Sequence, residues 1–261
     1  MYSFRGLVLC VLLLPSLGMG AQKQPVEQPI RIAAAADLQP VLPPLAKSFQ
    51  RCTGTPVQVS YASSATLTTQ ILNGAPYDLF LAANSAFPQK VVDAKLSEQP
   101  SPVVYARGVL VLWAAHGVAP DGLSMHGLTA PSIHRIAVAD PHHAPYGAAA
   151  IAALRASGLY AELEPKLVYA ENVAQAAQMA QSGNAQCALI SKTLAVSPVL
   201  RQAGSFVEVP ASFYPRMRQG AIVLRNSRRK MNADAFLRYL ASPTGRKLLV
   251  AGGLDAPGSS R

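Results

Sequence analysis

Two adjacent serines in the segment YASSATLTTQILNGAPYDLFLAAN, residues 61–84, have the type and spacing to bind a small anion. An alternating strand pattern runs up to Tyr61 and stops at Ser63 and Ser64, where the apolar spacing changes to that of a helix over 64–73. A helix start leaves backbone N–H groups unpaired at the positive end of the helix dipole. Amides and serine hydroxyls there could hold an oxyanion, and the alternative is that both serines only cap the helix.

The elements that must position these serines follow an α/β pattern, because apolar strand-like runs alternate with Ala-rich helical patterns. Leu38 to Phe49 also carries a helical stripe, which we expect to be kinked because Pro43 and Pro44 fall inside it. The predicted strands are 30–35, 57–61, 78–83, 103–114, 135–139, 187–191, 206–209 and 219–224, and the other predicted helices are 64–73, 147–157, 173–182 and 232–251.

The first twenty residues resemble a secretory signal, with Arg5 before an apolar run from Leu7 to Leu14 and the small residues Gly18 and Gly20 behind it. We therefore predict a signal peptide over residues 1–20, cleaved near Gly20. The apolar run is too short to span a bilayer, and no later stretch is long enough, which predicts a soluble exported protein.

Charge and cysteine content limit the partners. The formal net charge of +10 favours an anionic ligand. Nucleic acid is the competing partner, but export would separate the protein from it, and the basic residues within 225–230 lack interleaved aromatic residues. We predict no nucleic-acid partner. Beyond the signal only Cys52 and Cys187 remain, and we predict that they stay unpaired.

Four segments in one order carry a family resemblance: AAAADL at 33–38, YASSATL with GAPYDLF within 61–80, ADPHHAPYG at 139–147 and YAENVAQA at 169–176. Together they resemble the periplasmic molybdate-binding proteins of ABC importers. The resemblance implies a two-lobed type II periplasmic binding protein fold, each lobe a sheet flanked by helices, with the ligand in the cleft between them. Lobe one would comprise 21–106 and 216–261, and lobe two 107–215.

The resemblance also implies a function. The chain would capture molybdate, and also tungstate, in the periplasm and deliver it to the membrane permease of an ABC importer. It would act as a monomer, without a cofactor and without enzymatic activity. The oxyanion contacts carried over by position are Asp37, Ser63 and Ser64 from lobe one, and Tyr146, Val173 and Ser191 from lobe two.

Individual site residues allow sharper expectations. Asn172 as N-cap with Gln175 three residues later resembles a capping box, which leaves the Val173 amide in the first helical turn. Asp37 stands where the family often has a serine, and an ionised carboxylate would repel a dianion. We therefore expect its side chain to cap its own helix, so that only the backbone N–H meets the ligand. Ser191 stands where the family often has a tyrosine.

Three alternatives remain open. The binding protein could prefer sulfate, phosphate or a small organic anion, because helix dipoles do not distinguish these ligands. A zinc site could use Asp140 and histidines, although their spacing matches no closed zinc motif. The histidines are His116, His126, His134, His142 and His143. An exported hydrolase would also suit an α/β core, but neither a GxSxG elbow nor HExxH occurs.

Overall fold

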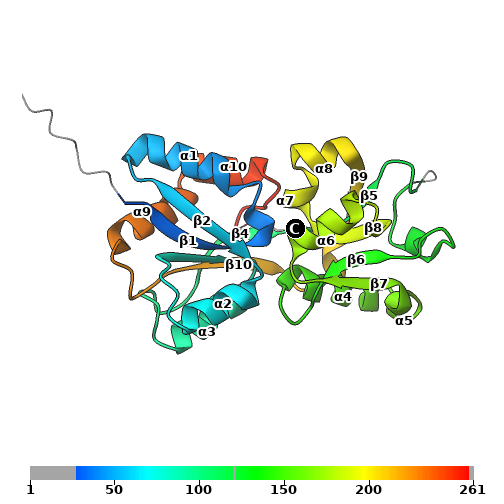
Figure 1. Ribbon diagram of the computed structural model, residues 1–261, viewed down its shortest axis with the longest axis horizontal. Helices are drawn as coiled ribbons and strands as arrows, with labels where there is room; N and C mark the ends of the chain where they lie inside the picture. The colour runs from blue at the N-terminus through cyan, green and yellow to red at the C-terminus, as the bar shows by residue number, and fades with distance from the viewer. Residues whose placement is uncertain (1–27, 120–121, 259–261) are drawn as a thin grey trace, which may run out of the picture.

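The strands pair into two separate five-stranded sheets, one in each half of an elongated molecule (Figure 1). The computed structural model describes residues 28–119 and 122–258. The first sheet has the order β2 (Val57–Ala62), β1 (Ile30–Ala35), β3 (Leu79–Ala82), β10 (Met217–Val223), β4 (Val103–Gly108). The second has the order β7 (Leu167–Ala170), β6 (Ile136–Ala139), β8 (Cys187–Ser191), β5 (Leu110–Ala115), β9 (Gly204–Glu208).

Each sheet combines a parallel core with antiparallel neighbours. In the first, β1 pairs in parallel with β2 and β3, while β10 runs antiparallel to β3 and β4. In the second, β6 pairs in parallel with β7 and β8, and β5 runs antiparallel to β8 and β9. Parallel strands end at a common sheet edge, which is where ligands bind in open α/β sheets. The predicted fold class is therefore confirmed.

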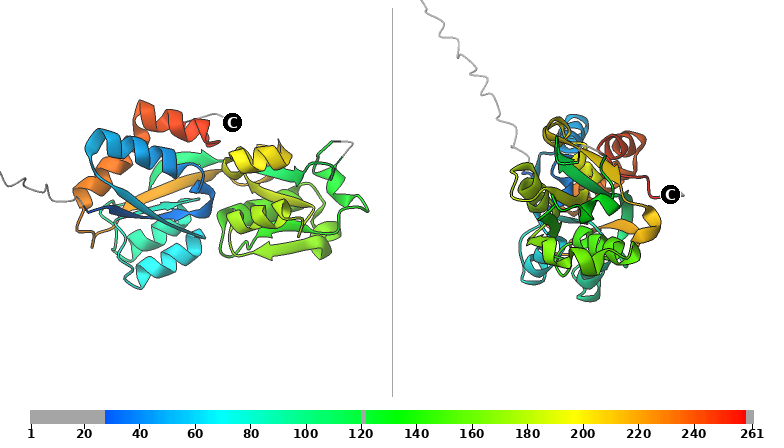
Figure 2. Two further views of the ribbon diagram at one scale, coloured as in Figure 1. Left: turned by 45° about the horizontal axis from the view of Figure 1, so that its top comes forward. Right: turned by 90° about the vertical axis from the view of Figure 1, so that its right-hand side faces the viewer.

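Helices cover both faces of the first sheet (Figures 1 and 2). Leu45 and Phe49 of α1 share an apolar core with Phe236 of α9, whereas Leu67 of α2 and Val91 of α3 belong to a separate cluster on the other face. The helices are α1 (Leu42–Thr53), α9 (Lys230–Ala241) and α10 (Pro243–Ala251) on one side, and α2 (Ser64–Leu72) and α3 (Ala86–Asp93) on the other.

The second sheet has a comparable cover, in which α4 and α6 pack on opposite faces (Figure 1). One large apolar cluster, which includes the fully buried Trp113, fills this lobe. The α-helices are α4 (Pro145–Ala156), α5 (Tyr160–Leu163), α6 (Val173–Gln181), α7 (Lys192–Ala195) and α8 (Pro198–Ala203). Short 3-10 turns lie at η1 (Ala36–Leu38), η2 (His126–Thr129), η3 (Glu164–Lys166) and η4 (Ala211–Phe213).

Two predicted elements are divided in the structure. The apolar run 103–114 forms β4 and β5, which belong to different sheets, so the chain crosses between the lobes at Gly108 and Val109. It returns after β9 through η4 into β10. The predicted helix 232–251 is two helices, because Ser242 ends α9 and its Oγ caps α10 by accepting from the amide of Gly245 at 3.1 Å.

The expected kink in the 38–49 stripe is wrong. The α-helix begins only at Leu42, so Pro43 and Pro44 lie in its first turn, where no intrahelical N–H bond is lost. The predicted elements also did not include the strand β7 or the helices α3, α5, α7 and α8. Over the ranges that the structure describes, none of the helices is both long and apolar enough to span a membrane. The predicted signal peptide, residues 1–20, lies outside those ranges.

Candidate anion-binding site

Segments from both lobes meet around one small cavity. Its volume is about 10 Å³, far smaller than the ~300–1,000 Å³ of a typical organic ligand pocket. Its lining contains no lysine or arginine. The residues that line it are Ala35, Ala36, Asp37, Ser63, Ser64, Ala83, Ala144, Pro145, Tyr146, Asn172 and Val173. Five of the six predicted contact residues are among them, and Ser191 is not.

The cavity lies where four strands end and four helical segments begin. The ends of β1, β2, β6 and β7 lead into η1, α2, α4 and α6, respectively. Both lobes thus direct helix starts toward the same point, and the unpaired N–H groups and dipoles of such starts favour an anion. Gly147 permits this approach at α4, because a Cβ there would collide with the backbone carbonyl of Ala139.

The two serines at the start of α2 have different roles. Ser63 is the N-cap, and its Oγ accepts from the amide of Thr66 at 3.1 Å and lies 2.8 Å from the hydroxyl of Thr66. The Oγ of Ser64 instead accepts from the amide of Ala83 at 3.2 Å, across to the end of β3. That bond fixes the Ser64 oxygen as an acceptor and leaves its O–H available to donate to a ligand.

The predicted cap of α6 is confirmed. Asn172 Oδ1 accepts from the amides of Ala174 at 3.0 Å and Gln175 at 3.1 Å. Gln175 Oε1 reaches back to the amide of Glu171 at 3.1 Å, one residue before the cap. No group in the described part of the chain accepts from the Val173 amide, which therefore remains a donor at the cavity wall.

The Asp37 side chain does not cap its own helix, so that expectation is wrong. Asp37 is the second residue inside η1, and the cap position belongs to Ala35, which makes no side-chain cap bond. Its carboxyl is fully buried, and Oδ2 accepts from Gln219 Nε2 at 2.5 Å. Tyr105 Oη donates to the side-chain oxygen Oε1 of Gln219 at 2.7 Å, and Gln219 Nε2 donates to Tyr146 Oη at 3.4 Å.

Burial sets the charge state of this carboxyl. Desolvation raises the pKa of Asp37 to about 7, and hydrogen bonds from Gln219, Tyr146 and its own backbone amide lower the pKa only in part. Asp37 Oδ1 is buried and has no hydrogen-bond partner among the residues described. The cavity therefore carries an acid that is near its midpoint of ionisation at neutral pH.

Ser191 lies behind the cavity. Its Oγ caps α7 by accepting from the amide of Leu194 at 3.4 Å, and it is 2.8 Å from Thr193 Oγ1. Thr193 Oγ1 in turn donates to the backbone carbonyl of Asp37 at 2.6 Å, from one lobe to the other. Ser191 thus supports the Asp37 turn only indirectly, through Thr193. Its hydroxyl is occupied by Thr193 and by the cap of α7.

The lobes are in contact at the cavity rim, which identifies a closed arrangement. Besides the Thr193 bond, the amide of Ala65 donates to the carbonyl of His143 at 3.1 Å. The predicted site residues did not include Gln219, Tyr105 or Thr193, which hold the Asp37 side chain and backbone. Gln219 is fully buried although it directly follows the exposed Arg218 in β10, so the sequence pattern did not mark it as a buried polar residue.

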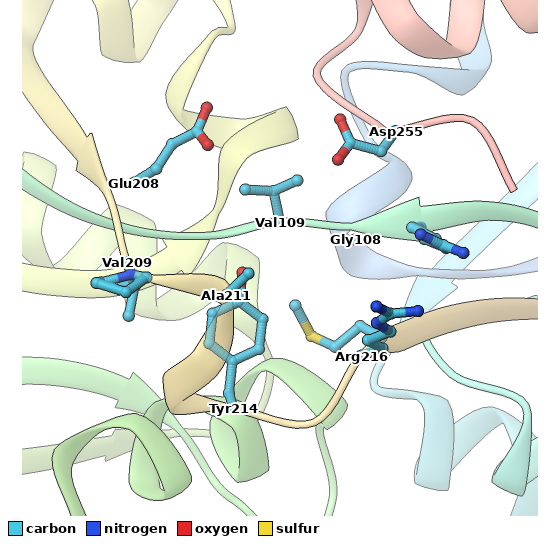
Figure 3. A pocket seen from close by; sticks show the side chains of 11 residues that line it. Gly108, Val109, Glu208, Val209, Ala211, Tyr214, Arg216 and Asp255 are labelled. Atoms are coloured by element: carbon cyan, nitrogen blue, oxygen red, sulfur yellow. The ribbon is translucent and has the colours of Figure 1, made fainter. Parts of the chain in front are cut away.

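A second pocket lies at the two chain crossings, and Figure 3 shows it at Gly108 and Val109. Its wall contains the carboxylates of Glu208 and Asp255 together with Arg216, so it differs from the cavity, whose lining contains no lysine or arginine. Gly108 has a further role, because a Cβ at this position would collide with the hydroxyl of Tyr146.

The histidines form no cluster suited to a cation. Asp140 Oδ2 lies 3.4 Å from His143 Nδ1, but the described residues contain no group of three or more potential metal ligands. Cys52 and Cys187 are free thiols, one exposed and one buried. The zinc alternative therefore gains no support from this arrangement.

Two α/β lobes that close over a small cavity of helix starts define a binding protein of the periplasmic type. The chain belongs to the bacterial extracellular solute-binding proteins, whose family description matches residues 30–255. The predicted family is therefore confirmed.

Similar proteins include the molybdate-binding protein ModA of Rhodobacter capsulatus, 32% identical over 217 residues that cover 83% of this chain and 84% of that protein. ModA of Azotobacter vinelandii is 32% identical over 225 residues, which cover 86% of this chain and 88% of that protein. A solved structure of the Azotobacter vinelandii periplasmic molybdate-binding protein matches with a TM-score of 0.81 at 29% identity, over 87% of this chain and 99% of that one. These relatives are solute-binding proteins.

Proposed function

We propose that this protein captures molybdate, and also tungstate, in the cavity between its lobes and delivers it to the permease of an ABC importer. The observation that carries the proposal is the meeting of helix starts from both lobes at one cavity without a lysine or arginine. The names of the relatives support the choice of molybdate. Neutral donors suit a fully deprotonated oxyanion, since a proton on the anion would need an acceptor.

The proposed contacts differ in kind. Ser64 donates through its hydroxyl, and Val173 donates through its backbone amide. Tyr146 contributes through the amides of the first turn of α4, and Asp37 through its turn and its carboxyl. Ser63 lines the cavity but acts chiefly as the cap of α2, and Ser191 acts through Thr193. The molybdenum is thus held as an oxyanion, with no protein atom as a cation ligand.

The mature chain would work as a monomer of two lobes, 21–106 with 216–261 and 107–215, after removal of residues 1–20 near Gly20. Sheet membership supports a division of this kind, since β10 returns to the first sheet, although β4 of that sheet extends to Gly108. A ligand that touches both lobes stabilises the closed state by its additional contacts there. The protein makes and breaks no bond, needs no cofactor, and acts in the periplasm.

Isothermal titration of the mature chain with sodium molybdate, tungstate, sulfate and phosphate tests the function. We expect tight binding of molybdate and tungstate and no response to sulfate. A sulfate or phosphate preference, or preference for a small organic anion in a wider screen, would refute the named ligand. Turnover of a chromogenic ester would refute the absence of catalysis.

A further inference from the structure

We propose that Asp37 binds a fully deprotonated oxyanion with its carboxyl group protonated, so that each bound dianion is accompanied by one proton on this side chain. The inference rests on the proposed function. It concerns a side chain that the sequence analysis expected to turn away from the ligand.

The position of the carboxyl is the first argument. Asp37 lines the cavity, is fully buried, and does not cap its own helix. Its backbone carbonyl is held by Thr193 at 2.6 Å, and its Oδ2 by Gln219 at 2.5 Å. Both bonds oppose rotation of the carboxyl out of the cavity wall when the lobes are closed.

The surrounding charge is the second argument. An ionised carboxylate beside a dianion would place three negative charges in a small space, and no lysine or arginine lines the cavity to balance them. The side chains that act on the Asp37 carboxyl from the packed elements are Tyr105 on β4, Gln219 on β10 and Tyr146 on α4, whereas Thr193 on α7 bonds its backbone carbonyl. Burial and the nearby Asp37 carboxyl raise the pKa of both phenols well above the ordinary value, so they remain neutral.

The two carboxyl oxygens provide the third argument. Oδ2 already accepts from Gln219, whereas the buried Oδ1 has no partner in the part of the chain that the structure describes. A proton on Oδ1 would make this oxygen a donor to an anion oxygen. Asp37 would then act as a donor, as the Ser64 hydroxyl and the Val173 amide do. Above neutral pH, where the carboxyl of the ligand-free protein is ionised, this proton comes from solvent on binding and returns to solvent on release.

The same arrangement bears on hydrogen phosphate. An anion that carries a proton requires an acceptor in the site. Oδ2 of Asp37 is held by Gln219, but an ionised Oδ1 would be such an acceptor, so hydrogen phosphate would bind with Asp37 ionised and without proton uptake. Proton uptake therefore separates the two modes of binding.

The pH dependence follows from linkage. Since burial raises the pKa of Asp37 to about 7, the group takes up little proton on binding at pH 6 and nearly one at pH 9. The association constant should be level below neutral pH and fall about tenfold for each pH unit above it. Between pH 6 and pH 9 the loss is roughly hundredfold.

The experiment measures proton uptake directly in the mature wild-type chain. Molybdate is titrated at pH 6 and pH 9, at each pH in two buffers that differ in ionisation enthalpy, so that the difference in heat gives the protons bound per anion. Asp37→Asn retains the size and a donor but cannot titrate, and should bind with no proton uptake and a flat pH profile. At pH 9 it should bind roughly a hundredfold more tightly than the wild type.

Asp140→Asn is the matched control, because it also removes a carboxylate near the start of α4 but does not line the cavity. It should keep the proton uptake of the wild type. Molybdate binding without proton uptake at pH 9 would overturn the inference while leaving the function intact, as would equal uptake in Asp37→Asn. The wild-type measurement decides even if the Asp37 variant fails to fold. Absence of heat with any of the four anions would overturn the proposed function together with the inference.

Discussion

Ser64→Ala tests whether Ser64 donates to the anion, in contrast to Ser63, which caps α2. The Ser64 side chain is buried at the cavity wall, and its oxygen is fixed by the Ala83 amide at 3.2 Å. A hydrogen bond to a charged partner contributes about 1.5–3 kcal/mol. Loss of this donor should therefore weaken molybdate binding roughly 10- to 150-fold.

The substitution also has a separate effect on stability. It leaves the Ala83 amide without its acceptor in a buried position, which costs about 1–3 kcal/mol in the free energy of unfolding. Urea denaturation of the ligand-free protein measures this term, and isothermal titration measures the loss of affinity. The two readouts keep the structural role of the hydroxyl apart from its role toward the anion.

Thr68→Val is the control for Ser64. Thr68 lies one turn further along α2, where its hydroxyl donates to the Ser64 carbonyl at 2.8 Å, and it is buried but does not line the cavity. Its loss should reduce stability with little change in affinity. If Ser64→Ala bound molybdate as tightly as Thr68→Val, Ser64 would be only a structural residue and the proposed contact would be wrong.

Three further predictions concern the cavity. Gly108→Ala should weaken molybdate binding, because the new methyl group would collide with the Tyr146 hydroxyl and push Tyr146 away from the cavity rim. Titration calorimetry measures this change. Unchanged affinity would show that the close approach of Gly108 to Tyr146 does not affect binding. Val173→Pro should fold, since proline suits a first helical position after the extended Asn172, but it should bind at least about tenfold more weakly than Val173→Ala, which keeps the amide. Asp37 has its pKa raised from 3.8 to about 7, so the unfolding free energy of the ligand-free protein should fall as pH rises from about 4 to 7. The loss is at most about 4 kcal/mol, and urea denaturation at a series of pH values measures it. Asp37→Asn should lack this decrease in unfolding free energy, and the same decrease in the variant would show that another group causes it.

The helix starts were predictable because their determinants are local. Ser63 and Asn172 accept from amides two or three residues later, and such bonds are encoded in residue type and spacing. The apolar runs similarly predicted most strands. An apolar run does not reveal which sheet it joins, however, so the change from β4 to β5 at Gly108 was not visible in 103–114.

The sequence by itself therefore determined the α/β class, the caps that begin α2 and α6, and the family resemblance that located the candidate anion site. Tertiary structure alone decided the orientation of Asp37, which follows from a bond to Gln219, a residue 182 positions away. It also decided that Ser191 supports the cavity from behind through Thr193, on the far side of the lobe boundary from Asp37. The physical reason is that cap bonds are formed within one turn, whereas a buried carboxyl takes its partner and its pKa from whatever distant elements pack around it.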